Sequence, residues 1–165
     1  MLASGDPPIP EVPDPWDAID VLEAHDSAPD FDTRWRGFLR DCALLLLPRL
    51  PPAAAGWVAT ADEFDAGRLS AESLTGARVE AWRFHNAQQA IRSAAELSGL
   101  RVVMYRLWPP GADRWWRESA WHFLHFLRTA GCAEEQWWLL LRARFAGVLG
   151  GPPDAESGAE ADRRT

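Results

Sequence analysis

The chain has 165 residues, of which 47% are hydrophobic, and its formal net charge is −7 at pH 7. This length and apolar content predict one soluble domain with one substantial core. The sequence contains no run of about 18 apolar residues, which is the length needed to span a membrane. The negative net charge argues against a general nucleic-acid-binding surface.

Both ends of the chain are predicted to be disordered tails. Residues 1–14 contain four prolines among acidic and small residues, and they lack the basic start and apolar centre of a secretory signal. Residues 150–165 begin Gly-Gly-Pro-Pro and contain no large apolar side chain. We therefore expect a helical domain over residues 15–149 and a cytoplasmic location.

Three helices are predicted in the first part of the chain, over residues 15–25, 30–47 and 52–66. Asp14 followed by a proline is typical of a helix start, with the aspartate as N-cap. Pro48 ends the second helix, since proline cannot continue the hydrogen-bond ladder. Gly67 follows the third helix, where a left-handed residue is favoured.

Further helices are predicted over residues 70–99, 100–108, 113–130 and 133–149. In the first of these, Ser70 is the expected N-cap, and apolar residues three and four apart form a seam from Leu74 to Ala95. The pair Val102-Val103 would suit a strand, but the apolar spacing around it fits a helix, and a lone strand would have no sheet to join. The predicted fold class is all-α, a single compact bundle of about six helices.

The charge is unevenly distributed along the chain. Residues 14–66 contain 4 Arg and 11 acidic residues, whereas residues 67–128 contain 9 Arg and 5 acidic residues. The two halves could attract each other across the fold, or the acidic half could offer a face to a basic partner.

Ten tryptophans are present, and we expect most of their rings in the core and some as surface anchors for a partner. One candidate partner-binding stripe lies beside the seam of the fourth predicted helix: Arg78, Trp82, His85, Gln89 and Arg92. The stripe could instead pack under the later helices. The run from residue 137 to 141 is apolar nearly all round, which implies full burial or a self-association face.

The second candidate surface surrounds Trp121, which lies with Arg117 outside the apolar arc of the helix predicted over residues 113–130. We expect Trp121 to be at least partly exposed. Its ring is either a partner-binding anchor or half of an intramolecular cation–π pair with an arginine.

Glu118, His122 and His125 are the best candidates for metal ligands. They fall within about a 60° arc of one helix, and His85 could supply a further ligand for zinc or another transition metal. Glu118 and His125 lie opposite the predicted core arc, however, so the alternative interpretation is a set of solvent-facing side chains.

No other pattern indicates catalysis. The sequence contains no Gly-x-Ser-x-Gly elbow, no glycine-rich phosphate loop and no dinucleotide fingerprint, so no cofactor is expected. Cys132 stands beside a predicted helix start but has no evident base, and we interpret it as structural. The acidic run Asp62, Glu63 and Asp65 is interpreted as a solvated helix end.

The segment from Trp57 to Trp82, WVATADEFDAGRLSAESLTGARVEAW, resembles a helix–turn–helix pattern in uncharacterised helical proteins of large-genome bacteria of the planctomycete type. An amphipathic helix precedes that pattern, as residues 30–50 do here, although the dense cysteines often found there are missing. The resemblance covers about residues 30–82. It implies an all-helical fold and transfers no function and no site residue.

The leading hypothesis is a non-enzymatic helical module for protein–protein interaction, of the antitoxin-like, immunity-like or regulatory-subunit kind. Its expected partner is a protein, either basic or a second copy of the chain. The alternative hypothesis is a metal-dependent helical-bundle enzyme that uses Glu118, His122 and His125.

Overall fold

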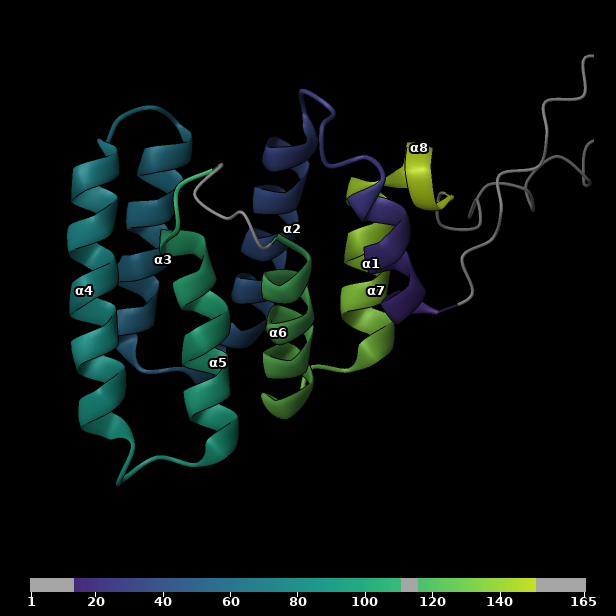
Figure 1. The fold of residues 1–165 in the computed structure, drawn as a ribbon. Coiled ribbons are helices and arrows are strands. Elements are labelled where there is room, and N and C mark those ends of the chain that lie inside the picture. Colours follow the sequence, from purple (N-terminus) through teal and green to yellow (C-terminus); the bar gives the residue numbers. More distant parts are fainter. Residues whose placement is uncertain (1–13, 111–115, 151–165) are drawn as a thin grey trace, which may run out of the picture.

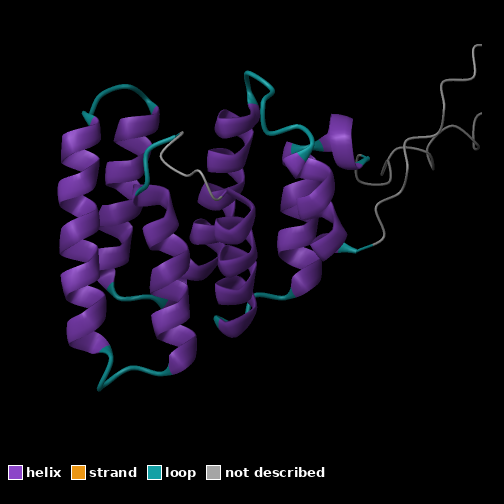
Figure 2. Cartoon of the chain, viewed as in Figure 1, coloured by secondary structure: helices purple, strands orange, loops and turns teal. Residues whose placement is uncertain are grey.

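A computed structural model describes residues 14–110 and 116–150, with the side chain of residue 116 outside that description. Within these ranges every regular element is a helix (Figures 1 and 2), so the all-α prediction is confirmed. The elements are α1 (Pro15–Glu23), α2 (Phe31–Leu46), η1 (Leu47–Arg49), α3 (Pro52–Asp65), α4 (Ala71–Gln88), α5 (Ala94–Met104), η2 (Tyr105–Leu107), α6 (Trp116–Thr129), α7 (Glu134–Arg144) and α8 (Ala146–Leu149).

The described part of the chain thus holds eight α-helices, where about six were predicted. No described helix combines the length and the apolar character needed to cross a bilayer. The predicted tails, residues 1–14 and 150–165, lie almost wholly outside the described residues.

The helices pack in two groups that share a middle layer. Helices α3, α4 and α5 lie at one end of the molecule, α1, α7 and α8 lie at the other, and α2 and α6 stand between them (Figure 1). Buried apolar side chains form two clusters, one centred on α1, α2, α6 and α7 and the other on α3, α4 and α5. Helices α2 and α5 contribute side chains to both clusters.

Several helix ends follow the predicted local chemistry. The carboxylate of Asp14 accepts a hydrogen bond from the backbone N–H of Trp16 at 2.8 Å, and the hydroxyl of Ser70 accepts one from Ser73 at 3.2 Å. Gly67 has a φ of 72°, the left-handed conformation that glycine adopts without steric cost. The starts of α1 and α4 and the end of α3 are therefore as predicted.

The long fourth helix predicted over residues 70–99 is wrong. Helix α4 ends at Gln88, and α5 begins after Ser93, whose side chain caps the backbone N–H of Glu96 while the Glu96 carboxylate accepts from Ser93. This reciprocal capping box satisfies backbone N–H groups at the start of α5, which would have been bonded within the helix if one continuous helix ran through this region. The seam residue Ile91 is consequently 75% exposed in the turn.

Gly99, predicted to mark a helix end or kink, lies inside α5 and is buried. A Cβ atom at this position would lie 2.8 Å from Cδ2 of Leu50. Glycine therefore lets α5 approach the segment between η1 and α3 closely.

Replacing Ser93 by alanine should lower the free energy of unfolding by about 1 kcal/mol, because the first turn of α5 loses its side-chain cap. Urea unfolding followed by circular dichroism measures this change. Ser27→Ala is the control, since Ser27 is exposed and caps no helix. Equal midpoints for the two variants would show that the capping box does not stabilise the break.

Two of the helices predicted after residue 99 differ in outcome, since one is confirmed and one is wrong. Residues 100–107 are helical, as predicted. The last predicted helix, over residues 133–149, is instead two helices separated at Phe145, whose φ and ψ of −121° and 34° are not helical. Within α7, Trp137 is 1% exposed while Leu139 is 52% exposed, so the full burial that was one of the two expectations for residues 137–141 is not observed.

Candidate partner-binding surface

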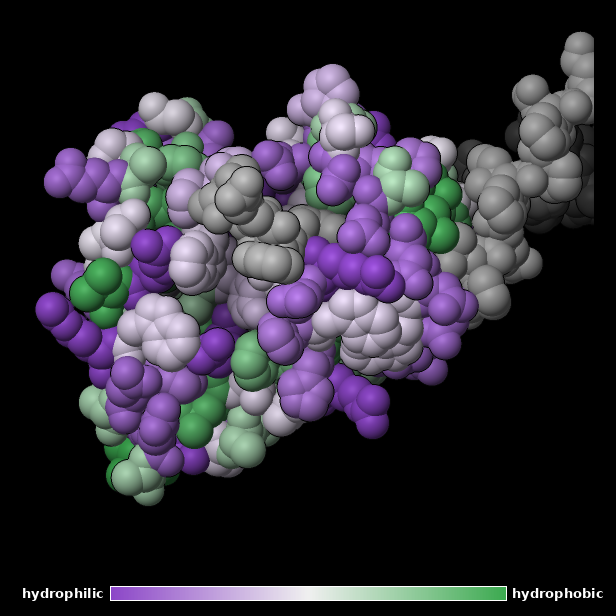
Figure 3. Space-filling view, in the orientation of Figure 1, coloured by the Kyte–Doolittle hydropathy of each residue, from purple (hydrophilic) through white to green (hydrophobic). Residues whose placement is uncertain are grey.

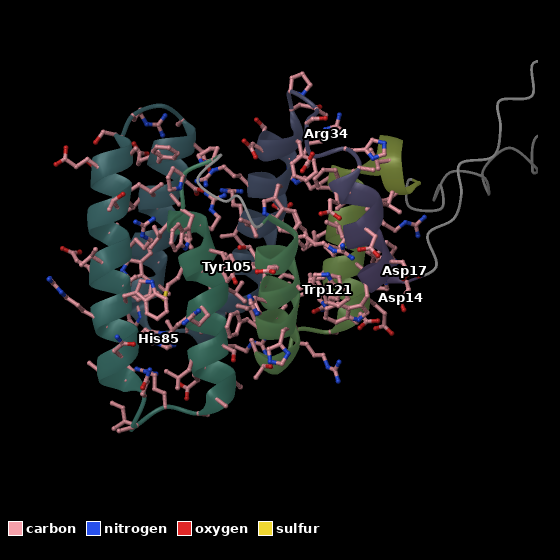
Figure 4. The ribbon with its side chains drawn as sticks, viewed as in Figure 1. Asp14, Asp17, Arg34, His85, Tyr105 and Trp121 are labelled. Atoms are coloured by element: carbon pink, nitrogen blue, oxygen red, sulfur yellow. The ribbon has the colours of Figure 1, made fainter. Side chains whose placement is uncertain are left out.

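A pair of stacked tryptophan rings lies at the surface between α1 and α6. Trp121 of α6 is 39% exposed, which confirms the predicted exposure. Its ring stacks on Trp16 of α1 with the centroids 4.9 Å apart and the planes at 19°. Trp121, labelled in Figure 4, therefore pairs with another tryptophan, and no arginine of the described residues forms a cation–π contact with its ring.

The stack rests on a buried ring. Trp16 meets Trp137 of α7 edge to face, with centroids 6.3 Å apart. Such a perpendicular arrangement places the positive edge of one ring against the negative face of the other. The exposed stack is thus anchored in the core, and its orientation is set by three helices.

Carboxylates border these rings along α1, which contains no basic residue. Arg117 of α6 donates to Asp20 at 2.5 Å and lies 3.4 Å from Glu23. Asp17 forms no ion pair with any described residue. Asp14 and Asp17 stand on the α1 side of Trp121 in Figure 4, and the space-filling view shows a pale patch over α1 and α6 bordered by hydrophilic surface (Figure 3). The face is aromatic at its centre and acidic along one border.

The stripe predicted on α4 does not form one free surface. The guanidinium carbon of Arg78 lies 4.0 Å from the ring centroid of Trp108, and that of Arg101 lies 4.2 Å from the ring of Trp82. His85, labelled on α4 in Figure 4, is 6% exposed, and burial lowers the pKa of its imidazole. These three α4 side chains pack against η2 and α5, which was the alternative interpretation.

The other two residues of the stripe lie beyond the end of α4. Gln89 is exposed in the turn after the helix. Arg92 donates to the side chains of Gln88 at 2.8 Å and Glu96 at 2.9 Å, so it stabilises the start of α5. The helix break therefore separates them from the rest of the predicted stripe.

The predicted metal ligands are exposed on α6. Among the residues that the structure describes, no group of three His, Cys, Asp or Glu side chains could hold a metal ion. Glu118, His122 and His125 face solvent, where no second helix completes a ligand set. His85 lies on α4 beside Trp82, with ring centroids 5.7 Å apart, and does not join them.

No protein-family model, no curated protein and no solved structure matches this chain. The resemblance over residues 30–82 therefore stays a prediction. The roles assigned to residues below come from their contacts within this chain.

A buried arginine pair connects α2, α3 and η2, and the sequence interpretation missed it. Arg106 is 1% exposed and donates to Asp62 at 2.6 Å and to the carbonyl oxygen of Arg36 at 2.9 Å. It also lies 2.9 Å from Asp65, which pairs with Arg36 as well. In return, Arg36 donates to the carbonyl oxygens of Arg106 at 3.1 Å and Trp108 at 2.5 Å.

This network corrects the interpretation of Asp62 and Asp65 as a solvated helix end. Burial lowers the pKa of Arg106, and the two carboxylates act in the opposite direction by favouring its charged form. Because Arg106 and Arg117 pair with carboxylates of the acidic half, the expected attraction between the two halves is observed.

Both cysteines are buried free thiols. Burial is the main cause that raises the pKa of Cys42 and of Cys132. Neither thiol is favoured as a thiolate near neutral pH, so the geometry gives no support to a nucleophilic role for Cys132.

Proposed function

We propose that this chain is a non-enzymatic helical protein-interaction module, of the antitoxin-like, immunity-like or regulatory-subunit kind, and that it binds a basic protein partner through the face between α1 and α6. The observation that carries the proposal is the exposed stack of Trp121 on Trp16. A large ring left in water forgoes about 1.5–3 kcal/mol of burial. Partner binding would recover that energy.

The charge around the stack favours a cationic partner. Asp17 has no described ion-pair partner, and Asp20 and Glu23 share the single guanidinium of Arg117. An arginine or lysine of a partner could stack on the open face of Trp121 while its neighbours pair with these carboxylates. A second copy would add its own acidic α1 to the contact, and this like charge makes self-association through this face less favourable than binding of a basic partner.

Replacing Trp121 by alanine should weaken partner binding by about 2 kcal/mol or more, which is roughly a 30-fold rise in Kd. The partner is first captured from cells that produce the protein and identified by mass spectrometry. Calorimetry with the purified partner then compares the wild type with Trp121→Ala. The same substitution should cost only about 1–2 kcal/mol of folding stability, since it removes one stacked, partly exposed ring.

Leu139→Ala is the matched control, because Leu139 is an exposed apolar residue that belongs to α7 and not to α1 or α6. Its affinity for the partner should equal that of the wild type. The proposal is overturned if no partner is captured reproducibly, or if Trp121→Ala and Leu139→Ala bind the captured partner equally well. Sedimentation of the wild type alone shows whether self-association accounts for any complex.

The metal-dependent alternative has no observation in its favour in the described geometry. Elemental analysis of natively purified protein tests it directly. Stoichiometric zinc or manganese that is lost in a His122→Ala variant would replace the interaction proposal with that alternative.

A further inference from the structure

A cavity of about 410 Å³ is lined by residues of α2, α4, α5 and α6 and by the segment that follows η2. Its wall includes Trp35, Trp82, Met104 and Tyr105, so it is predominantly aromatic and apolar. Small-molecule sites typically have volumes of about 300–1,000 Å³ and similar linings with few polar groups. The described lining of the cavity includes neither ring of the Trp16–Trp121 stack, nor Arg117.

Arg101 is the cation in this wall that has no counter-charge among the described residues. It is half-buried, with its guanidinium carbon 4.2 Å from the ring centroid of Trp82 and 4.9 Å from that of Phe126. No carboxylate in the described part of the chain lies within ion-pair distance of it. Burial lowers the pKa of Arg101, while Tyr105 acts in the opposite direction. The charge of Arg101 has therefore lost part of its hydration.

The other charged residues of the wall differ from Arg101. Arg36 already pairs with Asp65. Asp26 and Asp32 are exposed and therefore hydrated, so a ligand cation would gain little from them. A partly desolvated cation gains more from a new counter-charge than a hydrated carboxylate does. The electrostatics of the cavity thus favour an anionic ligand.

We propose that this cavity binds a small aromatic molecule that carries one carboxylate group. The aromatic body packs against Trp35, Trp82 and Tyr105, and the carboxylate pairs with the guanidinium of Arg101. The guanidinium already contacts the rings of Trp82 and Phe126, so little side-chain freedom is lost on binding.

Calorimetric titration with 2-naphthoate and with its neutral amide, 2-naphthamide, tests the proposal on the whole chain. The two probes have the same ring system and differ in the charged group. We expect the carboxylate to bind at least about tenfold more tightly than the amide, as a charge-assisted hydrogen bond implies. Equal affinities, or no binding of either probe, would overturn the proposal without need of any variant.

Two variants test the assigned residue. Arg101→Met should abolish the preference for 2-naphthoate, and Arg101→Lys should retain part of it. Arg83→Met is the control, because Arg83 is exposed on α4 and does not line the cavity. A preference that survives in a folded Arg101→Met variant would place the carboxylate elsewhere and contradict the assignment. If Arg101→Met does not fold, the test uses Arg101→Lys, and the ratio of its affinity for 2-naphthoate to its affinity for 2-naphthamide is compared with that of Arg83→Met. Equal ratios in the two variants, with no loss of affinity for 2-naphthoate in Arg101→Lys, would contradict the assignment of Arg101.

Discussion

Replacing Trp137 by alanine should lower the free energy of unfolding by about 3–5 kcal/mol, the largest effect that we expect from a single substitution. The Trp137 side chain is 1% exposed and is among the largest fully buried side chains described. Its removal leaves a cavity in the cluster formed by α1, α2, α6 and α7, and it withdraws the ring on which Trp16 rests. Guanidinium unfolding curves measured by far-ultraviolet circular dichroism give the change.

Trp138→Ala is the matched control, because it removes the same side chain from the next position of α7. Trp138 is half-buried, with its ring centroid 5.9 Å from the guanidinium carbon of Arg142. It should cost clearly less stability than Trp137→Ala. If the order of the two variants is reversed, then α7 presents a different face to the core from the one described here.

Replacing Asp65 by asparagine should destabilise the fold by about 3 kcal/mol. The substitution keeps the shape of the side chain but removes the carboxylate that faces both Arg36 and Arg106. Arg36 then has no carboxylate within ion-pair distance in the described residues, although its guanidinium remains buried. We place the loss at the lower end of the range for broken buried pairs because the Asp65 side chain is 29% exposed and Asp62 still pairs with Arg106.

Glu63→Gln provides the comparison within the same helix. Glu63 pairs with Arg68 at 2.6 Å, but both side chains are largely exposed, and such surface pairs contribute little to stability. Its melting temperature should match that of the wild type within experimental error. A loss for Glu63→Gln as large as that for Asp65→Asn would mean that the difference in burial does not govern these ion pairs.

Helix identity and many helix ends could be predicted from local chemistry. Asp14, Ser70 and Gly67 each act through hydrogen bonds or a φ angle within a few residues, which a single sequence displays directly. The end of α4 at Gln88 was not predicted, because the apolar seam suggests one helix that continues across Ile91. Ser93 and Glu96, which have the spacing of a capping box, are the local signal of the new helix. The capping box of Ser93 and Glu96 begins a new helix, and the exposed Ile91 shows that the apolar spacing does not continue across it.

The candidate surface was predicted only in part, for a related reason. The exposure of Trp121 follows from the apolar arc of its own helix, so periodicity sufficed. Its stacking partner, Trp16, lies on a helix distant in sequence, and no local pattern pairs the two. The same limit applies to Asp62 and Asp65, for which the sequence alone predicts a solvated helix end, because the arginines that they face come from α2 and η2.

The sharing of α2 and α5 between the two apolar clusters has a consequence for how the molecule opens. Helix α4 belongs to one cluster and α1 to the other, so either can detach while the opposite cluster stays intact. Neither α2 nor α5 can detach without exposing both clusters. Their backbone amides should therefore exchange with solvent deuterium only through global unfolding, whereas α1 and α4 should also exchange through separate, lower-energy openings.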